Sequence, residues 1–206
     1  MKQDSDYKKR DLLLEAAKKE FMERGYNKAS LRTICSNAGV TTGALYFFFE
    51  NKADLFAAIV DPPIAGLKKI LFDHIKEDSE YISKLESIGK IEMDHADISD
   101  VLTEHIYDNY ESFLLVLNSS ENTVYENVVD EFVKLTEVSV PAMITSLPGY
   151  TYDEYMSHWM AHITIDAFIQ VIKHETDKEK AKIRLRSIMN YLVKGWIELV
   201  LVKEGE

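Results

Sequence analysis

The sequence predicts an all-α protein, and three observations support this prediction. Only four prolines and eight glycines interrupt the 206 residues. Apolar side chains recur at helical spacing along most of the chain, and residues that cap helices stand before several of these segments. An apolar content of 46% is enough to build a hydrophobic core.

The first predicted helix spans residues 8–24. Leu14, Ala17 and Phe21 fall on one face of this helix and form its buried stripe. Gly25 follows, and glycine readily takes the left-handed conformation that ends a helix. The helix is therefore expected to stop at this glycine.

Two short helices are predicted next, joined by a sharp turn. Ser30 is a favourable N-cap for the first, Gly39 marks its end, and Thr41 is a favourable N-cap for the second. Leu45 and Phe49 lie on the inward face of the second short helix. This arrangement is typical of a helix-turn-helix, which places its second helix in the major groove of DNA.

The fourth predicted helix begins after Asn51, which can cap it, and meets Pro62 and Pro63. Two consecutive prolines remove two backbone donors, so a break or kink is expected there. Further helices are predicted from Asp97 to Leu117 and over residues 121–138.

Capping-box patterns open the last two predicted helices. Thr151 with Glu154 predicts a helix over residues 152–174, and Thr176 with Glu179 predicts one over residues 177–203. The apolar surface of the final helix is wider than one core face requires, which suggests a partner surface. The simplest partner is a second copy of the chain.

The charge distribution divides the chain. Residues 1–60 carry a net charge of +2 and residues 61–206 a net charge of −13. The first segment can approach DNA, whereas the second repels it. Cys35 is the only cysteine, and neither a signal peptide nor a membrane-spanning apolar run is evident, so a cytoplasmic protein is expected.

The candidate DNA-binding residues belong to the two short helices and their surroundings. Hydroxyl groups can bond bases or phosphates, a methyl group can contact thymine, and a glycine permits close approach. The candidates are Arg32, Thr33, Thr41, Thr42, Gly43, Ala44, Tyr46, Phe47 and Lys52. From geometry alone, a plain three-helix packing unit with a polar rim remains an equal alternative.

The segment from Leu13 to Phe56 resembles the head of the tetracycline-repressor (TetR) family of bacterial regulators. The matching pieces are Leu14, Ala16-Ala17, Phe21, Arg24-Gly25-Tyr26, Ser30-Leu31-Arg32, Ile34, Ala38-Gly39-Val40, Thr42-Gly43, Leu45-Tyr46, Phe49, Lys52 and Leu55. The chain departs from the family pattern at Cys35, usually alanine, and at Thr33, often acidic. Phe47-Phe48 replaces a pair that is often more polar, which bears on base preference.

The resemblance implies a helix-turn-helix domain over residues 1–52 and a helical ligand-binding and dimerisation domain over residues 53–206. It implies about nine helices, of which the last two form the dimer contact. The expected function is that of a transcriptional regulator, a repressor, which binds a near-palindromic operator as a homodimer. A small-molecule effector would switch it, and no membrane is involved.

Aromatic and sulfur-bearing side chains of the body are the candidates for the effector pocket, and they suit an apolar or aromatic ligand. They are Tyr107, Tyr110, Phe113, Met143, Tyr155, Met156 and Trp159, with His162 as a polar contact. The alternative that each merely builds the core stays open.

The second hypothesis is a helical enzyme or metal-binding protein. His158, His162 and Asp166 recur every four residues on one helical face, and such a set can hold iron or zinc. The same stripe continues into polar residues, which favours a solvated helix face. The regulator interpretation therefore expects no enzymatic activity, no catalytic residue, no metal and no cofactor.

Overall fold

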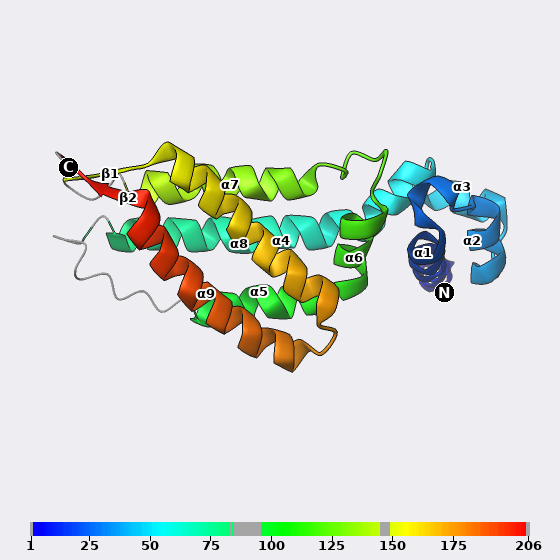
Figure 1. Cartoon of the computed structure of the whole chain (residues 1–206). Helices are drawn as coiled ribbons and strands as arrows, with labels where there is room; N and C mark the ends of the chain where they lie inside the picture. Colours follow the sequence, from blue (N-terminus) through cyan, green and yellow to red (C-terminus); the bar gives the residue numbers. More distant parts are fainter. Residues whose placement is uncertain (1, 83, 85–95, 145–148, 205–206) are drawn as a thin grey trace. The chain divides into compact units, whose positions relative to one another are not determined.

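A computed structural model describes residues 2–82, 84, 96–144 and 149–204 (Figure 1). The helices in these residues are α1 (Lys2–Lys28), α2 (Leu31–Ala38), α3 (Thr42–Phe48), α4 (Lys52–Ile82), α5 (Ala96–Asp108), α6 (Tyr110–Ser119), α7 (Val128–Ile144), α8 (Glu154–His174) and α9 (Lys178–Val200). Two short strands, β1 (Tyr150–Tyr152) and β2 (Leu201–Lys203), accompany them. The predicted all-α fold class is confirmed.

The chain forms two compact units. Unit 1 comprises Met1–Gly66 and Asn109–Val128, and unit 2 comprises Leu67–Asp108 and Val129–Glu206. The predicted boundary at residue 52 concerns function rather than compactness, and it stays a prediction.

Gly25 interrupts α1 as expected. Its φ of 72° and ψ of 162° are not helical, and the helical assignment resumes only for the last few residues. Tyr26 folds back, and its ring stacks on Phe21 with centroids 6.0 Å apart. The long segment therefore behaves as one helix ended by a glycine.

The caps of the two short helices are confirmed. The Ser30 hydroxyl accepts the N–H of Thr33 at 3.4 Å, and the Thr41 hydroxyl accepts the N–H of Ala44 at 3.2 Å. Gly39 has a φ of 66°, a left-handed conformation that closes α2 and turns the chain toward α3.

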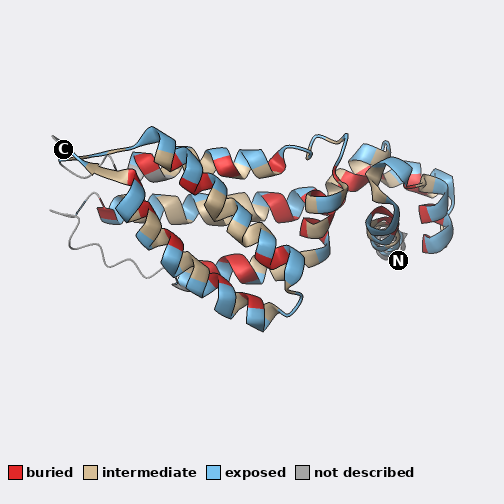
Figure 2. Ribbon diagram, viewed as in Figure 1, coloured by how far each residue is buried: buried red, intermediate tan, exposed pale blue. Residues whose placement is uncertain are grey.

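The core of unit 1 forms where α1, α2 and α3 pack together, and α6 packs against α1. Figure 2 shows the buried positions on the inward faces of these helices. The fully buried side chains include Leu13, Phe21, Ile34, Leu45, Leu55 and Phe56. Phe21 and Phe56 meet edge to face with centroids 5.1 Å apart, a favourable aromatic geometry.

A break at the prolines is contradicted, because Pro62 and Pro63 lie inside the continuous helix α4, whereas the alternative of a kink stays a prediction. The φ of proline is itself compatible with a helix, and the cost lies in the missing donor and the crowding of the preceding turn. Val60, Pro63 and Ile64 are buried at this point. Burial of these side chains offsets the local cost.

The single helix predicted from Asp97 to Leu117 is also wrong. Asn109, with φ −122° and ψ 28°, separates α5 from α6. Asparagine competes for backbone hydrogen bonds and disfavours helix interiors, so the signal was present but weak. The next helix starts at Val128 rather than at residue 121, and the turn before it holds Asn122 in the left-handed region.

Both predicted N-caps lie too early in the sequence. Thr151 precedes the observed cap of α8 by two residues, and Thr176 precedes that of α9 by one. Asp153 caps α8 by accepting the N–H of Met156 at 2.8 Å, and Asp177 caps α9 by accepting the N–H of Lys180 at 3.0 Å. Residues 150–152 instead form β1, which pairs antiparallel with β2. An aspartate directly before the helix outcompetes a threonine that belongs to a strand or loop.

The interior of unit 2 lies mainly where α9 packs against α8 and α5. Its buried cluster contains Val133, Met160, Ala161, Leu192, Trp196 and Val200. The indole N–H of Trp196 donates to the Thr164 hydroxyl at 3.1 Å, which satisfies the polar edge of this large side chain. Lys182 of α9 contacts Glu104 of α5 at 2.8 Å at the surface of the pair.

Candidate nucleic-acid interface

Helix α3 buries one face and exposes the other. Leu45 is fully buried, whereas Tyr46 is 55% exposed and Phe47 is 73% exposed. Thr42 and Gly43 are also exposed. The predicted DNA-binding residues of α3 therefore stand on the open side of the helix-turn-helix, within reach of a groove.

Two of the candidates, Thr41 and Ala44, form the N-terminal cap of α3. The Thr41 hydroxyl caps α3, which uses one of its acceptor sites but leaves its proton available. Ala44 donates the capped N–H and is half-buried. These residues set the start of α3, and Ala44 is less exposed than Thr42 and Tyr46.

Arg32 and Thr33 lie exposed in the first turn of α2. Thr33 gives its backbone N–H to the cap of this helix, so its side chain remains free of the capping role. The structure thus places a guanidinium and a hydroxyl at the start of the first helix of the motif.

Cys35 lies behind this surface and not on it. It is 3% exposed, and burial raises the pKa of its thiol, an effect that a hydrogen bond with the Thr42 side chain partly offsets. A buried, protonated thiol is a poor nucleophile and a poor target for oxidants. Its role is to fill space between α2 and the start of α3.

Comparison with known proteins agrees with this geometry. The family model described as "Bacterial regulatory proteins, tetR family" matches residues 13–59. The chain is 49% identical over 51 residues to the HTH-type transcriptional repressor BepR of Brucella suis, covering 25% of this chain and 24% of that protein. It is 36% identical over 77 residues to the HTH-type transcriptional regulator TtgR of Pseudomonas putida, covering 37% and 34% of the two chains.

Over residues 13–59 the chain is therefore similar to the N-terminal segment of TetR-family regulators. The matched segment spans only about a quarter to a third of the length of these curated relatives. The family model covers every residue from the buried Leu13 of α1 to Ile59 of α4, and hence the whole helix-turn-helix.

Solved structures of TetR-family proteins share the fold over most of the chain. A transcriptional regulator of the TerR/AcrR family from Aquifex aeolicus superposes with a TM-score of 0.62 at 19% identity, covering 89% of this chain and 99% of that one. SCO3833 from Streptomyces coelicolor gives a TM-score of 0.61 at 16% identity, covering 89% and 90%. At this identity the likeness concerns the fold.

Lys52 begins α4 as predicted, but its ammonium group makes contacts that the sequence did not reveal. Its ammonium group donates to the backbone carbonyls of Tyr26 at 2.8 Å, Asn27 at 3.2 Å and Ala29 at 3.4 Å. It also lies 4.6 Å from the centroid of the Tyr26 ring. Tyr26 and Asn27 lie in the last turn of α1 and Ala29 follows it directly, and a cation is favourable at the C-terminal end of a helix.

The Lys52 contacts join the beginning of α4 to the end of α1 inside unit 1. The three donors of the ammonium group match the three carbonyls, so the side chain is committed to the protein. Its predicted phosphate contact stays a prediction. A lysine at the start of a helix can contact either an anion or nearby backbone carbonyls. The sequence alone did not distinguish these two roles.

The predicted effector residues are dispersed. Tyr110 and Phe113 belong to α6 of unit 1, and the Tyr107 hydroxyl of unit 2 donates to the Glu175 carbonyl at 2.6 Å. Of the candidates on α8, Met156 is half-buried, whereas Tyr155, Trp159 and His162 are exposed. The side chain of Met143 lies outside the described residues.

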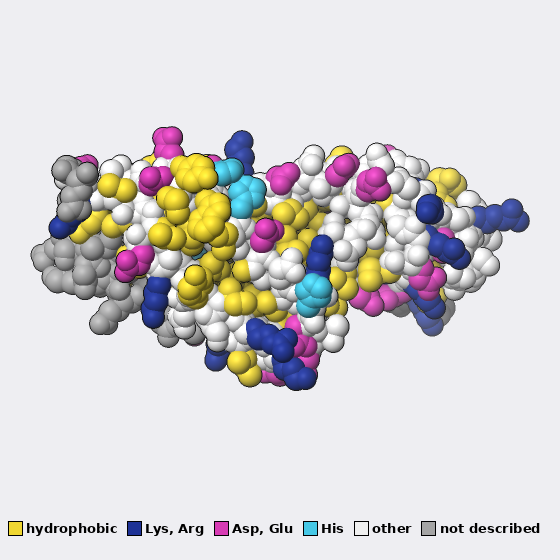
Figure 3. Space-filling view, viewed as in Figure 1, with side chains coloured by type: hydrophobic (Ala, Val, Ile, Leu, Met, Phe, Trp, Pro, Cys, Tyr) yellow, Lys and Arg dark blue, Asp and Glu magenta, His cyan; other side chains and the backbone are white. Residues whose placement is uncertain are grey.

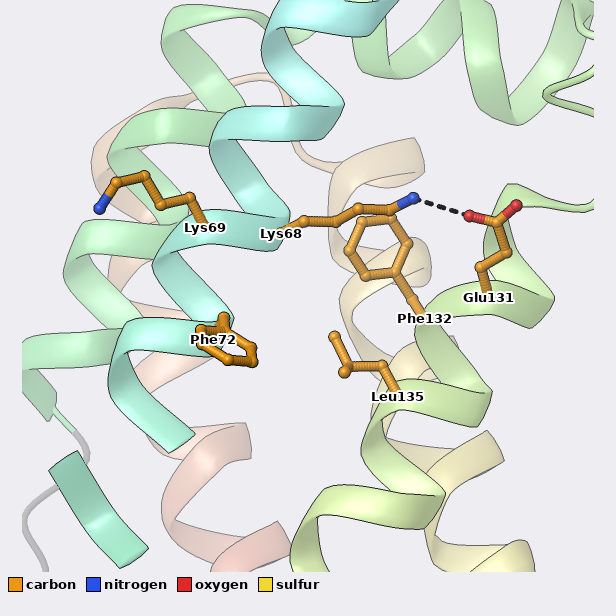
Figure 4. A pocket seen from close by; sticks show the side chains of 6 residues that line it. All are labelled: Lys68, Lys69, Phe72, Glu131, Phe132 and Leu135. Carbon is orange, nitrogen blue, oxygen red and sulfur yellow. Dashed lines mark hydrogen bonds and ion pairs between the residues drawn. The ribbon is translucent and has the colours of Figure 1, made fainter. Parts of the chain in front are cut away.

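Two hollows of unit 2 are lined by residues other than these candidates. The first, of about 460 Å³, lies between α4 and α7 and is lined by Lys68, Lys69, Phe72, Glu131, Phe132 and Leu135 (Figure 4). The second, of about 440 Å³, is lined by Lys134, Glu137, Val138, Pro141, Ala142, Tyr152, Glu154 and Ser157. None of the predicted effector residues whose side chains are described lines either hollow.

The first hollow is the more apolar of the two. Phe132 and Leu135 face Phe72 across it, and Lys68 spans its edge to contact Glu131 at 2.7 Å (Figure 4). The Lys68 ammonium also lies 5.8 Å from the centroid of the Phe132 ring.

The enzyme or metal hypothesis is not favoured. His158 lies 3.1 Å from Glu137 of α7, and the rings of His158 and His162 have centroids 4.7 Å apart. Within the described ranges, no group of three or more histidine, cysteine or acidic side chains is placed to hold a metal ion. Nor does any helix there combine the length and apolar character needed to cross a membrane.

The Lys52 contacts generate a testable prediction. Lys52→Met keeps the aliphatic stem but removes three charged hydrogen bonds, so the free energy of unfolding should fall by about 1–2 kcal/mol. Chemical denaturation followed by circular dichroism measures this, with Lys19→Met, at an exposed position of α1, as the control.

The same variant separates the two roles of Lys52. Loss of a phosphate contact lowers the slope of log affinity against log salt by about 1. We expect an unchanged slope and reduced stability. A reduced slope with unchanged stability would show that the ammonium group faces DNA instead.

Proposed function

We propose that this protein regulates transcription, acting as a repressor that binds a near-palindromic DNA operator as a homodimer. One observation carries the proposal, namely the exposed face of α3 with Thr42, Tyr46 and Phe47 on a helix anchored by the buried Leu45. A helix presented in this way, after a glycine turn, fits the major groove. Relatives that match this segment include proteins named as repressors, which supports the direction of control.

The polar side chains of this face suit both parts of a duplex. Thr42 and Tyr46 offer hydroxyl groups, and Arg32 offers a guanidinium at the start of α2. Hydroxyl and guanidinium contacts with phosphates fix the register of a protein on DNA, and base contacts then supply sequence preference. Contacts of these two kinds suit a transcriptional regulator in the bacterial cytoplasm. They require neither enzymatic activity nor a cofactor.

A symmetric pair would use the surface of α8 and α9. Large apolar side chains stand exposed on these helices, and Figure 3 shows hydrophobic atoms gathered over them. They are Tyr155, Trp159, Ile183, Tyr191 and Leu199. An apolar surface of this kind favours burial against a partner, and two-fold symmetry makes a second copy the simplest one.

The hollow between α4 and α7 is the proposed effector site. Its aromatic and aliphatic walls suit an apolar or aromatic small molecule, in line with the ligand class expected from the sequence. An effector acts by binding one conformation of the protein more tightly than another. We therefore propose that occupancy of this hollow alters the affinity for the operator.

The DNA interface is tested by Tyr46→Phe, which removes only an exposed hydroxyl. Loss of one hydrogen bond of about 1 kcal/mol should weaken operator binding about fivefold for each half-site. Fluorescence anisotropy with DNA from the promoter beside its own gene measures this, with Tyr7→Phe, also exposed, as the control. Equal affinity of Tyr46→Phe and wild type would argue against a DNA contact by this hydroxyl.

The dimer is tested by Tyr191→Asp. This side chain is 75% exposed in the single chain, so the substitution leaves the fold intact while placing a charge in the proposed interface. We expect sedimentation velocity to show a dimer for wild type and a monomer for the variant, with operator binding reduced at least about tenfold. Val124→Asp, at an 85% exposed site of unit 1, is the control. A monomeric wild type contradicts the proposal.

The effector site is tested with the apolar fluorescent anion 8-anilinonaphthalene-1-sulfonate. Leu135→Trp fills the hollow, so probe affinity should fall at least about tenfold. Bound probe should also lower the operator affinity of wild type but not of the variant. Val138→Trp, at an exposed residue of the second hollow, is the control. Probe binding that persists in Leu135→Trp places the ligand elsewhere.

A further inference from the structure

Phe47 has an unusual position for a large apolar side chain. It lies on the open face of α3, 73% exposed, and its ring has no hydrogen-bonding atom. Its burial against the core would be favourable, yet the helix turns it outward. A phenylalanine so placed contributes through apolar contact or not at all.

The Phe47 ring packs against one neighbouring ring. Phe47 meets Phe48 edge to face with centroids 4.9 Å apart and an interplanar angle of 84°. Phe48 in turn contacts Phe49, whose ring is 3% exposed and lies 5.5 Å from the guanidinium carbon of Arg10. These contacts connect the exposed Phe47 ring, through Phe48, to the buried Phe49 ring.

The surface beside Phe47 is open. Gly43 precedes it by one helical turn and shares its face of α3. A Cβ at Gly43 would meet only the Thr41 hydroxyl oxygen, at 3.9 Å. A groove wall can therefore approach the backbone closely at Gly43 while the Phe47 ring touches the base edges.

The remaining side chains of α3 discriminate bases poorly. The segment TGALYFF carries no charge, and it lacks the arginine, lysine, asparagine and glutamine side chains that pair with guanine or adenine. Hydroxyl groups bond several bases alike. Apolar contact is thus the main means by which the exposed face of this helix can distinguish one base from another.

We propose that Phe47 determines specificity by packing its ring against the C5 methyl group of a thymine in each operator half-site. Thymine alone carries a methyl group on the major-groove edge, and apolar side chains recognise it. This inference rests on the proposed function, because it requires DNA in the groove of α3. It adds the base and the residue that reads it.

The test uses the full-length protein and operators selected from a random pool of duplexes. Each thymine of a half-site is replaced in turn by deoxyuridine, which lacks only the methyl group. Wild type should lose about fourfold in affinity at one position per half-site, corresponding to about 0.8 kcal/mol for one buried methyl group. Phe47→Ala should bind the parent operator more weakly and show no further loss with deoxyuridine.

Two controls accompany this experiment. Val124→Ala removes an exposed apolar side chain of unit 1 outside α3 and should keep the deoxyuridine penalty. Phe47→Leu, which retains an apolar side chain, should keep part of it. Thermal unfolding of Phe47→Ala should match wild type, because the exposed ring contributes little to the core.

Three results would overturn the inference. A deoxyuridine penalty of equal size in wild type and Phe47→Ala means that another residue contacts the methyl group. Indifference of wild type to every deoxyuridine, with uniformly weaker binding by Phe47→Ala, means that the ring contacts deoxyribose. If wild type selects no duplex from the pool, the proposed function itself fails, and this inference fails with it.

Discussion

A helix of seven residues is not stable in water by itself, and the organisation of unit 1 follows from this constraint. Helix α3 exists because Leu45 and Phe49 are buried and because Thr41 and Gly39 fix its approach from α2. The burial of one face dictates that the opposite face meets solvent. Exposure of Thr42, Tyr46 and Phe47 is thus a consequence of the core, and any recognition by this helix depends on packing beneath it.

The support extends to both ends of the motif. Lys52 ties the start of α4 to the terminal carbonyls of α1, and the edge-to-face contact of Phe21 with Phe56 joins the same two helices through the core. The charged hydrogen bonds of Lys52 and the aromatic contact of Phe21 with Phe56 therefore both stabilise the contact between α1 and α4. These are the two helices that flank the two short helices in sequence.

Residues 8–49 were predictable because local signals and tertiary packing agree there. The caps at Ser30 and Thr41, the turn at Gly39 and the buried stripe through Leu45 all point to one structure.

The body was less predictable where local signals and tertiary packing disagree. Pro62 and Pro63 signal a break that burial overrides, and Asn109 gives only a weak signal for the real one. The strands at residues 150–152 and 201–203 depend on pairing between distant segments, which no local pattern encodes. For the same reason the sequence identified the exposed face of α3 but not the walls of the hollow formed by Phe72 and Phe132.

The composition of unit 1 has a practical consequence for those who recombine regulators by exchanging their N-terminal parts. Residues 109–128 belong to this unit, and α6 packs directly against α1. A chimera joined at residue 52 would carry α1 away from the helix that covers it and confront its exposed side with a foreign sequence. Grafts that also transplant the α6 segment, or that redesign the matching face of α1, preserve the interior of the transferred part.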